Sequence, residues 1–432
     1  MRITLKACLA VSILSAVAIS PAAAQVDTTP IGMTAQDGTG MVWATPWPPR
    51  PGELYRWQDG GWTPAHVQMP DRGSPVGIWA GPGGGVVVVF ANVPPGAAVA
   101  WYRGGQYKLL GKLEGGLGGL RVLSTPPDNL WITADGPNIY QLAPGGVMRV
   151  VYTFSPSQFF AYRHVPGEYT VDRPLEATTD GRGRTWFWST AAGAFINAAV
   201  VQGFLIYDGR SFAYHRSIEG LPQRALSCLG RVDGKHLWAA TLGGGMYSIN
   251  TESMAAERIR EPEPDAFARV TKIFRSGMDI YVVDDPRTGA MAETPAHRLT
   301  SVLWRYRKGQ WKEILAGIDD LPVASASLNR PWLASKAGMW LGTNASGLWF
   351  IPSGGQPPRL IDWRQGFPLD TVNALYRLGP RESAKRSHFF AVELKPGRAA
   401  AVTPASLLAP VKRSNVEVIN PYTSIQPDQQ HR

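Results

Sequence analysis

Short apolar stretches alternate with tight polar turns along most of the chain. The clearest copies are residues 37–45 and 180–186, where an Asp-containing turn leads to a Trp with the spacing D-x-x-G-x-[V/T]-W. Residues 233–241 carry a copy that is one residue shorter, and 128–133 and 337–343 are looser copies. Asp accepts hydrogen bonds in a turn, and Gly allows positive φ. The pattern predicts short β-strands that begin at tight turns, with the Trp packed between neighbouring sheets.

A second pattern places two aromatic residues five positions apart, with a glycine-containing turn between them. It occurs at residues 57–62, 102–107, 207–212 and 306–311. Two aromatic side chains at this distance can face each other across antiparallel strands. The second pattern therefore predicts four β-hairpins.

The first pattern recurs along the chain with a regular period. Its strands centre near residues 43, 87, 131, 187, 238, 281, 340 and 389, where the second, sixth and eighth are inferred from apolar runs alone. A period of 40 to 50 residues with four short strands predicts a β-propeller. A β-sandwich would lack this period, and a parallel α/β fold would need helical periodicity between the strands.

We therefore predict an all-β protein, a β-propeller of seven or eight four-stranded blades. Eight repeat units favour eight blades. Seven stays open because the first and last units could share a blade, since propellers often close by pairing the chain termini.

Composition agrees with this fold. The 432 residues include 47 Gly, 36 Pro and 16 Trp but only 2 Cys, and 18% are charged. These values exclude a coiled coil, a disordered chain and a disulfide scaffold. The net charge of +10 is scattered, so we expect no nucleic-acid partner.

The first 24 residues have the layout of a secretory signal peptide. Arg2 and Lys6 precede an apolar run at 7–19, and the small residues at 21–24 provide a cleavage site before Gln25. We therefore expect a periplasmic or secreted protein, with the propeller at 25–410 and a polar tail at 411–432. No later segment is apolar enough to span a membrane. We expect a monomer.

Cleavage at this site would leave one cysteine, Cys228, so no intrachain disulfide is possible. Because Cys228 lies in an apolar run, we expect a buried hydrophobic side chain rather than a nucleophile.

A third motif connects the units. Residues 219–222, 319–322 and 365–368 read roughly G-L-P before an apolar strand, and 338–348 contains G-M-W-L-G-T followed by G-L. Together they resemble the two-component-regulator propeller repeat, most clearly over residues 219–375. The resemblance implies a propeller of the kind found in periplasmic sensor regions of histidine kinases. Because no kinase or DNA-binding module is present, any signal would have to pass to another protein.

The lengths of the connections predict where a site lies. In a propeller, connections from second to third strands, and from fourth strands to the next blade, leave on one face. The long connections are of these kinds, and they lie at residues 45–53, 155–174, 190–203, 252–268 and 284–298. Long loops on a rigid scaffold are where binding residues concentrate. We call this predicted surface the long-loop face.

Three of these loops carry the candidate binding residues. Aromatic residues and Arg are enriched at recognition surfaces, and adjacent Asp residues can provide oxygen ligands to a cation. The candidates are Trp47 and Arg50 in the first loop, Phe160, Tyr162, Arg163, His164, Glu168 and Tyr169 in the second, and Asp284, Asp285, Arg287 and His297 in the last.

The sequence leaves two functional hypotheses. We find no zinc-protease, haem, nucleotide-binding or serine-hydrolase motif. This favours a non-catalytic exported propeller that binds a protein partner or a small ligand on the long-loop face, in sensing or assembly. The alternative is a lyase or hydrolase at the channel mouth that uses His164, Glu168 or Asp284 with a divalent cation. Apart from that cation, no cofactor or metal is expected.

Overall fold

The computed structural model describes residues 26–402 with internal gaps. Outside the description lie 1–25, 28, 30, 59–60, 67–72, 82–83, 94–95, 105, 114–119, 126–128, 134–137, 144, 154–161, 166–167, 171–174, 190–202, 223–225, 242–244, 264–265, 268–269, 285–300, 319–331, 336, 344–345, 354, 363, 365–366, 368, 370, 373, 378–388, 394–397 and 403–432. The described residues form eight four-stranded antiparallel sheets and one separate two-stranded sheet.

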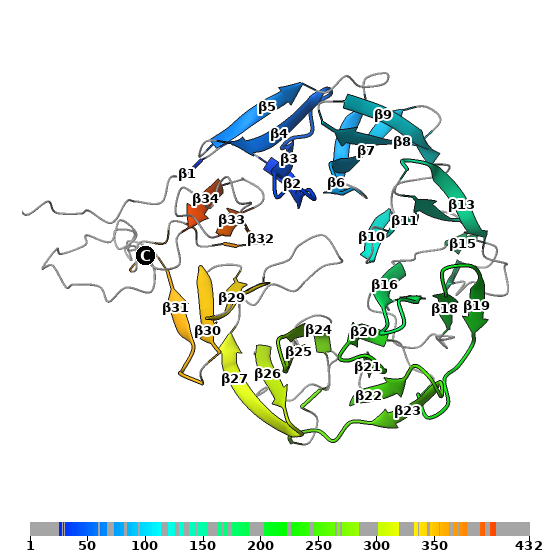
Figure 1. Cartoon of the computed structure of the whole chain (residues 1–432), viewed down its shortest axis with the longest axis vertical. Coiled ribbons are helices and arrows are strands. Elements are labelled where there is room, and N and C mark those ends of the chain that lie inside the picture. Colours follow the sequence, from blue (N-terminus) through cyan, green and yellow to red (C-terminus); the bar gives the residue numbers. More distant parts are fainter. Residues whose placement is uncertain are drawn as a thin grey trace, which may run out of the picture.

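The eight sheets are the blades of a propeller, arranged in a ring with their first strands innermost (Figure 1). Blade 1 contains β2 (Ile31–Gln36), β3 (Val42–Pro46), β4 (Glu53–Gln58) and β5 (Gly61–His66); blade 2 contains β6 (Ser74–Ala80), β7 (Val86–Val93), β8 (Gly96–Arg103) and β9 (Gln106–Leu113). Blade 3 contains β10 (Arg121–Thr125), β11 (Asn129–Thr133), β12 (Asn138–Leu142) and β13 (Met148–Thr153); blade 4 contains β16 (Leu175–Thr179), β17 (Thr185–Ser189), β18 (Phe204–Tyr207) and β19 (Phe212–His215).

The remaining blades follow in chain order. Blade 5 contains β20 (Leu226–Arg231), β21 (His236–Thr241), β22 (Gly245–Asn250) and β23 (Ala255–Arg258); blade 6 contains β24 (Val270–Ser276), β25 (Asp279–Asp284), β26 (Ser301–Arg307) and β27 (Gln310–Ile318). Blade 7 contains β28 (Trp332–Ala334), β29 (Gly338–Gly342), β30 (Leu348–Pro352) and β31 (Arg359–Ile361); blade 8 contains β32 (Ala374–Arg377), β33 (Phe389–Glu393), β34 (Arg398–Val402) and β1 (Val26–Asp27).

Blade 8 closes the ring by joining the two ends of the propeller. The short strand β1 pairs with β34, with Val26 opposite Ala400 and Asp27 opposite Ala399. The predicted closure by the chain termini is therefore present. It occurs within an eighth four-stranded sheet, so the predicted fold class is confirmed.

Both sequence repeats have a fixed place in the blades. All eight predicted strand centres lie in second strands, namely β3, β7, β11, β17, β21, β25, β29 and β33. The four aromatic hairpins all join third and fourth strands. In each of them the two aromatic residues are direct cross-strand partners, as Trp57 and Trp62 are in blade 1.

The Asp-containing turn binds the indole of the Trp that follows it. Trp43 Nε1 donates to Asp37 Oδ2 at 2.9 Å, and Trp186 Nε1 donates to Asp180 Oδ2 at 2.9 Å. In all three copies the Asp carboxylate also accepts backbone N–H groups of its own turn, which in the shorter copy are those of Lys235 and His236. Where Trp follows Asp by six positions, its indole thus donates to the Asp carboxylate. Where it follows by five positions, in blade 5, this hydrogen bond is not made.

The core lies between neighbouring blades, where the predicted Trp packing is observed. Trp43 of blade 1 meets Tyr102 of blade 2 edge to face at 5.0 Å between ring centroids, and Trp131 of blade 3 meets Phe187 of blade 4 at 5.1 Å. Cys228 is also buried in this core, and burial raises the pKa of its thiol to about 11. The predicted role of Cys228 as a buried small side chain is confirmed.

The G-L-P motif at 219–222 has a structural role. The chain there runs along the outer edge of blade 5, where the Ala256 N–H donates to the Glu219 carbonyl at 2.7 Å. Gly220 has φ +75°, and a Cβ at this residue would lie 2.1 Å from the Ala256 carbonyl oxygen. Leu221 enters the core between blades 4 and 5. The motif therefore holds the connection that leaves blade 4 against the outer edge of blade 5.

Candidate functional site

The five long connections join the strands that the prediction required. Residues 47–52, 190–203 and 285–300 join second to third strands, and 154–174 and 259–269 join a fourth strand to the next blade. A further connection of similar length, 319–331, also joins a fourth strand to the next blade. Residues 378–388 are an exception, because they join the first and second strands of blade 8.

One predicted boundary was wrong. The range 252–268 contains the fourth strand β23, so the connection begins at residue 259. β23 follows a tight turn in which the Met254 N–H donates to the Asn250 carbonyl at 3.0 Å. Met254 takes a positive φ of 57° at this turn. Because the turn contains no glycine, the glycine-based turn patterns did not mark it.

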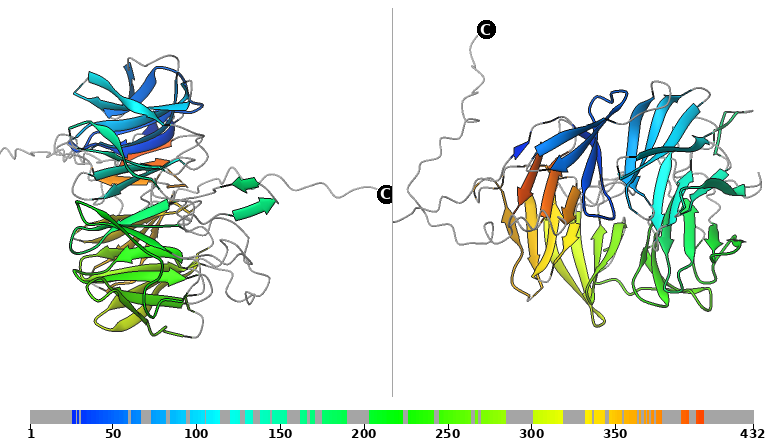
Figure 2. Two further views of the ribbon diagram at one scale, coloured as in Figure 1. Left: turned by 90° about the vertical axis from the view of Figure 1, so that its right-hand side faces the viewer. Right: turned by 45° about the horizontal axis from the view of Figure 1, so that its top comes forward.

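Within the 154–174 connection the structure contains a β-hairpin. β14 (Tyr162–Val165) pairs with β15 (Glu168–Thr170), with Arg163 opposite Tyr169. The two strands form a sheet of their own, hydrogen-bonded to no blade among the described residues. Figure 2 shows them standing away from the disk of blades, beyond one of its faces. We call this element the projecting hairpin.

The projecting hairpin brings together most of the candidates in this loop. Its first strand contains Tyr162, Arg163 and His164, and its second contains Glu168 and Tyr169. The sequence predicted a loop here rather than two strands. Phe160 lies outside the described residues.

The β3–β4 loop carries the next two candidates, Trp47 and Arg50. Trp47 is 39% exposed, and its ring lies beside Gly32 in β2, the innermost strand of blade 1. Arg50 Nη1 lies 3.6 Å from Glu53 Oε2, and the Tyr55 hydroxyl donates to the same oxygen at 3.4 Å. Burial and the Glu53 carboxylate raise the pKa of Tyr55. The loop thus presents an exposed indole and an ion pair near the inner edge of blade 1.

Asp284 differs from the other candidates because it is buried. It ends β25, is 8% exposed, and pairs with Val302 in the sheet. Asp285, Arg287 and His297 lie outside the described residues. Among the residues that are described, no three His, Cys, Asp or Glu side chains gather into a group that could hold a metal ion. The divalent cation of the catalytic hypothesis stays a prediction.

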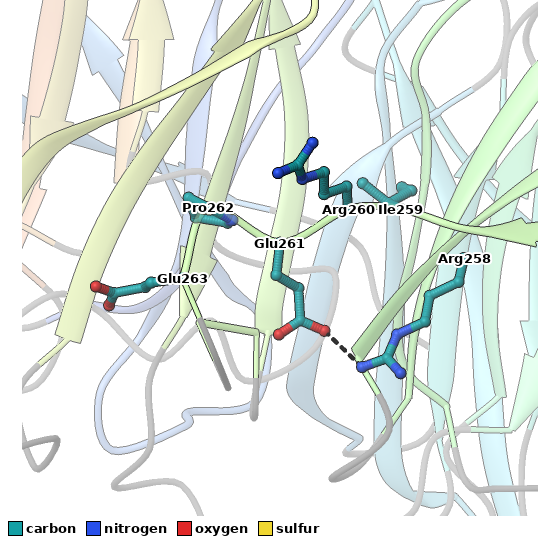
Figure 3. A pocket seen from close by; sticks show the side chains of 6 residues that line it. All are labelled: Arg258, Ile259, Arg260, Glu261, Pro262 and Glu263. Atoms are coloured by element: carbon teal, nitrogen blue, oxygen red, sulfur yellow. Dashed lines mark hydrogen bonds and ion pairs between the residues drawn. The ribbon is translucent and has the colours of Figure 1, made fainter.

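The sequence did not predict a pocket of about 510 Å³ beside the 259–269 connection. Its lining is the continuous segment Arg258, Ile259, Arg260, Glu261, Pro262 and Glu263 (Figure 3). Arg258 and Glu261 point toward each other and form an ion pair with 2.9 Å between Nη2 and Oε1. This pairing raises the pKa of Arg258. The run of two cations followed by two carboxylates in R-I-R-E-P-E was the signal that could have identified the segment.

The same segment links two blades. The Arg260 carbonyl accepts a hydrogen bond from Trp311 Nε1 in β27, the outer strand of blade 6, at 3.0 Å. The pocket therefore lies at the outer edge between blades 5 and 6. Its charged side chains can bind polar groups of either sign, and no nucleophilic Ser, Thr or Cys lines it.

No helix within the described parts of the chain is long and apolar enough to cross a membrane.

No protein-family model and no curated protein matches the sequence. Among solved structures, Sqt1 of Saccharomyces cerevisiae gives a TM-score of 0.56 at 9% identity, covering 87% of this chain and 96% of Sqt1. The propeller of Dos1 gives 0.54 at 9% identity, covering 87% and 94%. BamB from Moraxella catarrhalis gives 0.43 at 11% identity, covering 74% and 85%. The first two likenesses support the propeller fold, and at these identities they show the fold alone.

Proposed function

We propose that this chain is an exported, non-catalytic propeller that binds a protein partner on its long-loop face, with the projecting hairpin as the principal contact. The observation that carries the proposal is the isolation of β14 and β15 from every blade among the described residues. A two-stranded hairpin alone is marginally stable in water. A partner that pairs with the hairpin would supply stabilising contacts beyond the pairing of its own two strands.

The strands of the hairpin also suit a protein contact. Both have an edge that no described strand covers, and such edges can pair with an added strand of another chain. The sequence of β14 and β15 combines Tyr, Arg and His, residue types that supply packing area and hydrogen-bond donors at protein interfaces.

Export is part of the same proposal. Its basis is the signal-peptide pattern of residues 1–24. The ring-closing strand β1 begins at Val26, so cleavage before Gln25 would leave that strand next to the new N-terminus. The resemblance to sensor-type propeller repeats points in the same direction, with a role in sensing or assembly. We therefore place the partner in the periplasm or outside the cell.

The test replaces residues 161–171 with a Gly-Ser linker. The intact chain and the linker variant are immobilised, and proteins retained from an extract of the source cells are compared by quantitative mass spectrometry. Lys108→Gln, a change at an exposed position on the outer strand β9, serves as the comparison variant. The unfolding temperature of the linker variant should match that of the intact chain, because β14 and β15 pair with no blade strand that the structure describes.

We expect a protein that the intact chain and Lys108→Gln retain and that the linker variant loses. Retention of the same proteins by all three chains would refute the role of the hairpin. Failure of the intact chain to retain any protein specifically would refute the binding function.

A further inference from the structure

The face opposite the projecting hairpin carries a group of cationic side chains that the proposed function does not use. They come from the turns between first and second strands, and from the ends of the first strands that lead into those turns, in three successive blades. We call Arg182 of blade 4, Arg231 and Lys235 of blade 5, and Arg275 of blade 6 the turn-face cluster.

Two members of the cluster share one carboxylate. Arg182 Nη2 lies 2.9 Å from Glu252 Oε1, and Lys235 Nζ lies 3.4 Å from Glu252 Oε2. Their hydrogen bonds and charge lower the pKa of Glu252. The Arg182 and Lys235 side chains are 50% and 64% exposed, so both remain accessible from solvent.

The other two members bind neutral acceptors. Arg275 Nη1 donates to the Val232 carbonyl at 3.1 Å and its Nε to the Gly277 carbonyl at 2.8 Å. Arg231 Nε donates to the Asp233 carbonyl at 3.2 Å. Both guanidinium groups thus converge on the Val232–Asp233 turn next to Lys235. A backbone carbonyl orients a guanidinium without neutralising its charge.

The cluster contains more cations than carboxylates. Among the described parts of the chain, the carboxylates in contact with its residues are Glu252 and Asp233, against four cations. The adjacent cations Arg184 and Arg307 are each paired with a buried Asp and add nothing to the excess. The result is an exposed, oriented group with two unbalanced positive charges at one place on the ring.

We propose that the turn-face cluster binds an acidic segment of a protein. Three of its four cations are Arg, whose planar donor groups match discrete carboxylates. Carbonyl contacts already hold two of them, so less side-chain freedom is lost on binding. Asp233 and Glu252 lie among the cations and would repel a continuous anionic surface, whereas separate carboxylates can approach the Arg groups between them. These features favour an acidic polypeptide over an anionic membrane.

The test uses two double variants of the full chain with equal loss of charge. Arg231→Gln with Lys235→Gln removes two cations from the cluster. Lys108→Gln with Lys312→Gln removes two exposed cations from the outer strands β9 and β27. Binding of a fluorescein-labelled poly-Glu peptide is measured by anisotropy at low and at physiological ionic strength. Thermal unfolding checks that both variants fold.

We expect the unmodified chain to bind poly-Glu and the cluster variant to bind it roughly three- to tenfold more weakly, with the control near the unmodified chain. Equal weakening in both variants would refute the proposal, because net charge alone would then explain binding. No binding by the unmodified chain would also refute it. Vesicles containing phosphatidylglycerol provide a second arm. Cluster-dependent binding to vesicles without binding to poly-Glu would overturn the acidic-protein assignment in favour of a membrane.

Discussion

Asp180 illustrates how single residues fix the turns of this ring. Its side chain is fully buried, yet it accepts bonds from the backbone N–H groups of Arg182 and Arg184, from Arg184 Nε and from Trp186 Nε1. A buried carboxylate is tolerated only when such partners compensate for the loss of water. The turn next to Asp180 packs against the turn of blade 5, where Gly181 meets Gly234.

This contact predicts unequal effects of the same substitution at two facing glycines. A Cβ at Gly181 would lie 1.8 Å from the Gly234 carbonyl oxygen, whereas a Cβ at Gly234 would meet nothing within 4 Å. Gly181→Ala must therefore push two blades apart and should reduce the free energy of unfolding by about 1–3 kcal/mol. Gly234→Ala should change it by less than about 0.5 kcal/mol. Chemical denaturation of both variants checks the prediction, and equal stability of the two would contradict the contact.

At the scale of elements, the sequence predicted strands well where a repeat marked them. Five second strands and all four aromatic hairpins were located because Asp, Gly and aromatic residues recur at fixed spacing, and the other three second strands, β7, β25 and β33, were located from apolar runs at the same period. β23 was missed because its turn uses Met254 at positive φ rather than glycine. β14 and β15 were missed because they follow no repeat and pair only with each other.

Removal of β1 is the simplest test of how the ring closes. Its two residues complete blade 8, so a chain that starts at Thr29 should be less stable than one that starts at Gln25. Loss of a few ladder hydrogen bonds should cost about 1–3 kcal/mol. Thermal and chemical unfolding provide the measurement.

A chain that ends at residue 410 is the matched control for this truncation. It lacks only the predicted tail, so its stability should equal that of the longer chain. The closure by β1 would be contradicted if the chain from Thr29 were as stable as the chain from Gln25.

At the scale of the whole molecule, the period and the connection lengths predicted the ring and the face with most of the long loops. They could not predict which side chains meet across blades. Arg182 and Glu252 are 70 positions apart, and their contact depends on how neighbouring turns approach. The turn-face cluster therefore emerged only from the structure. The pocket at Arg258–Glu263 is lined by one continuous segment, whose charge pattern is visible in the sequence. Among the candidate residues, those of the projecting hairpin came together on one element, while Asp284 proved to be buried.

The central claim is that the projecting hairpin contacts a protein partner, and site-specific photo-crosslinking in living source cells tests it most directly. A photoreactive amino acid is placed at position 163 in β14 or, as the control, at position 108 on the outer strand β9. We predict a discrete adduct from position 163 that contains the protein lost by the linker variant, and no such adduct from position 108. No adduct from position 163, or the same adducts from both positions, would contradict the claim.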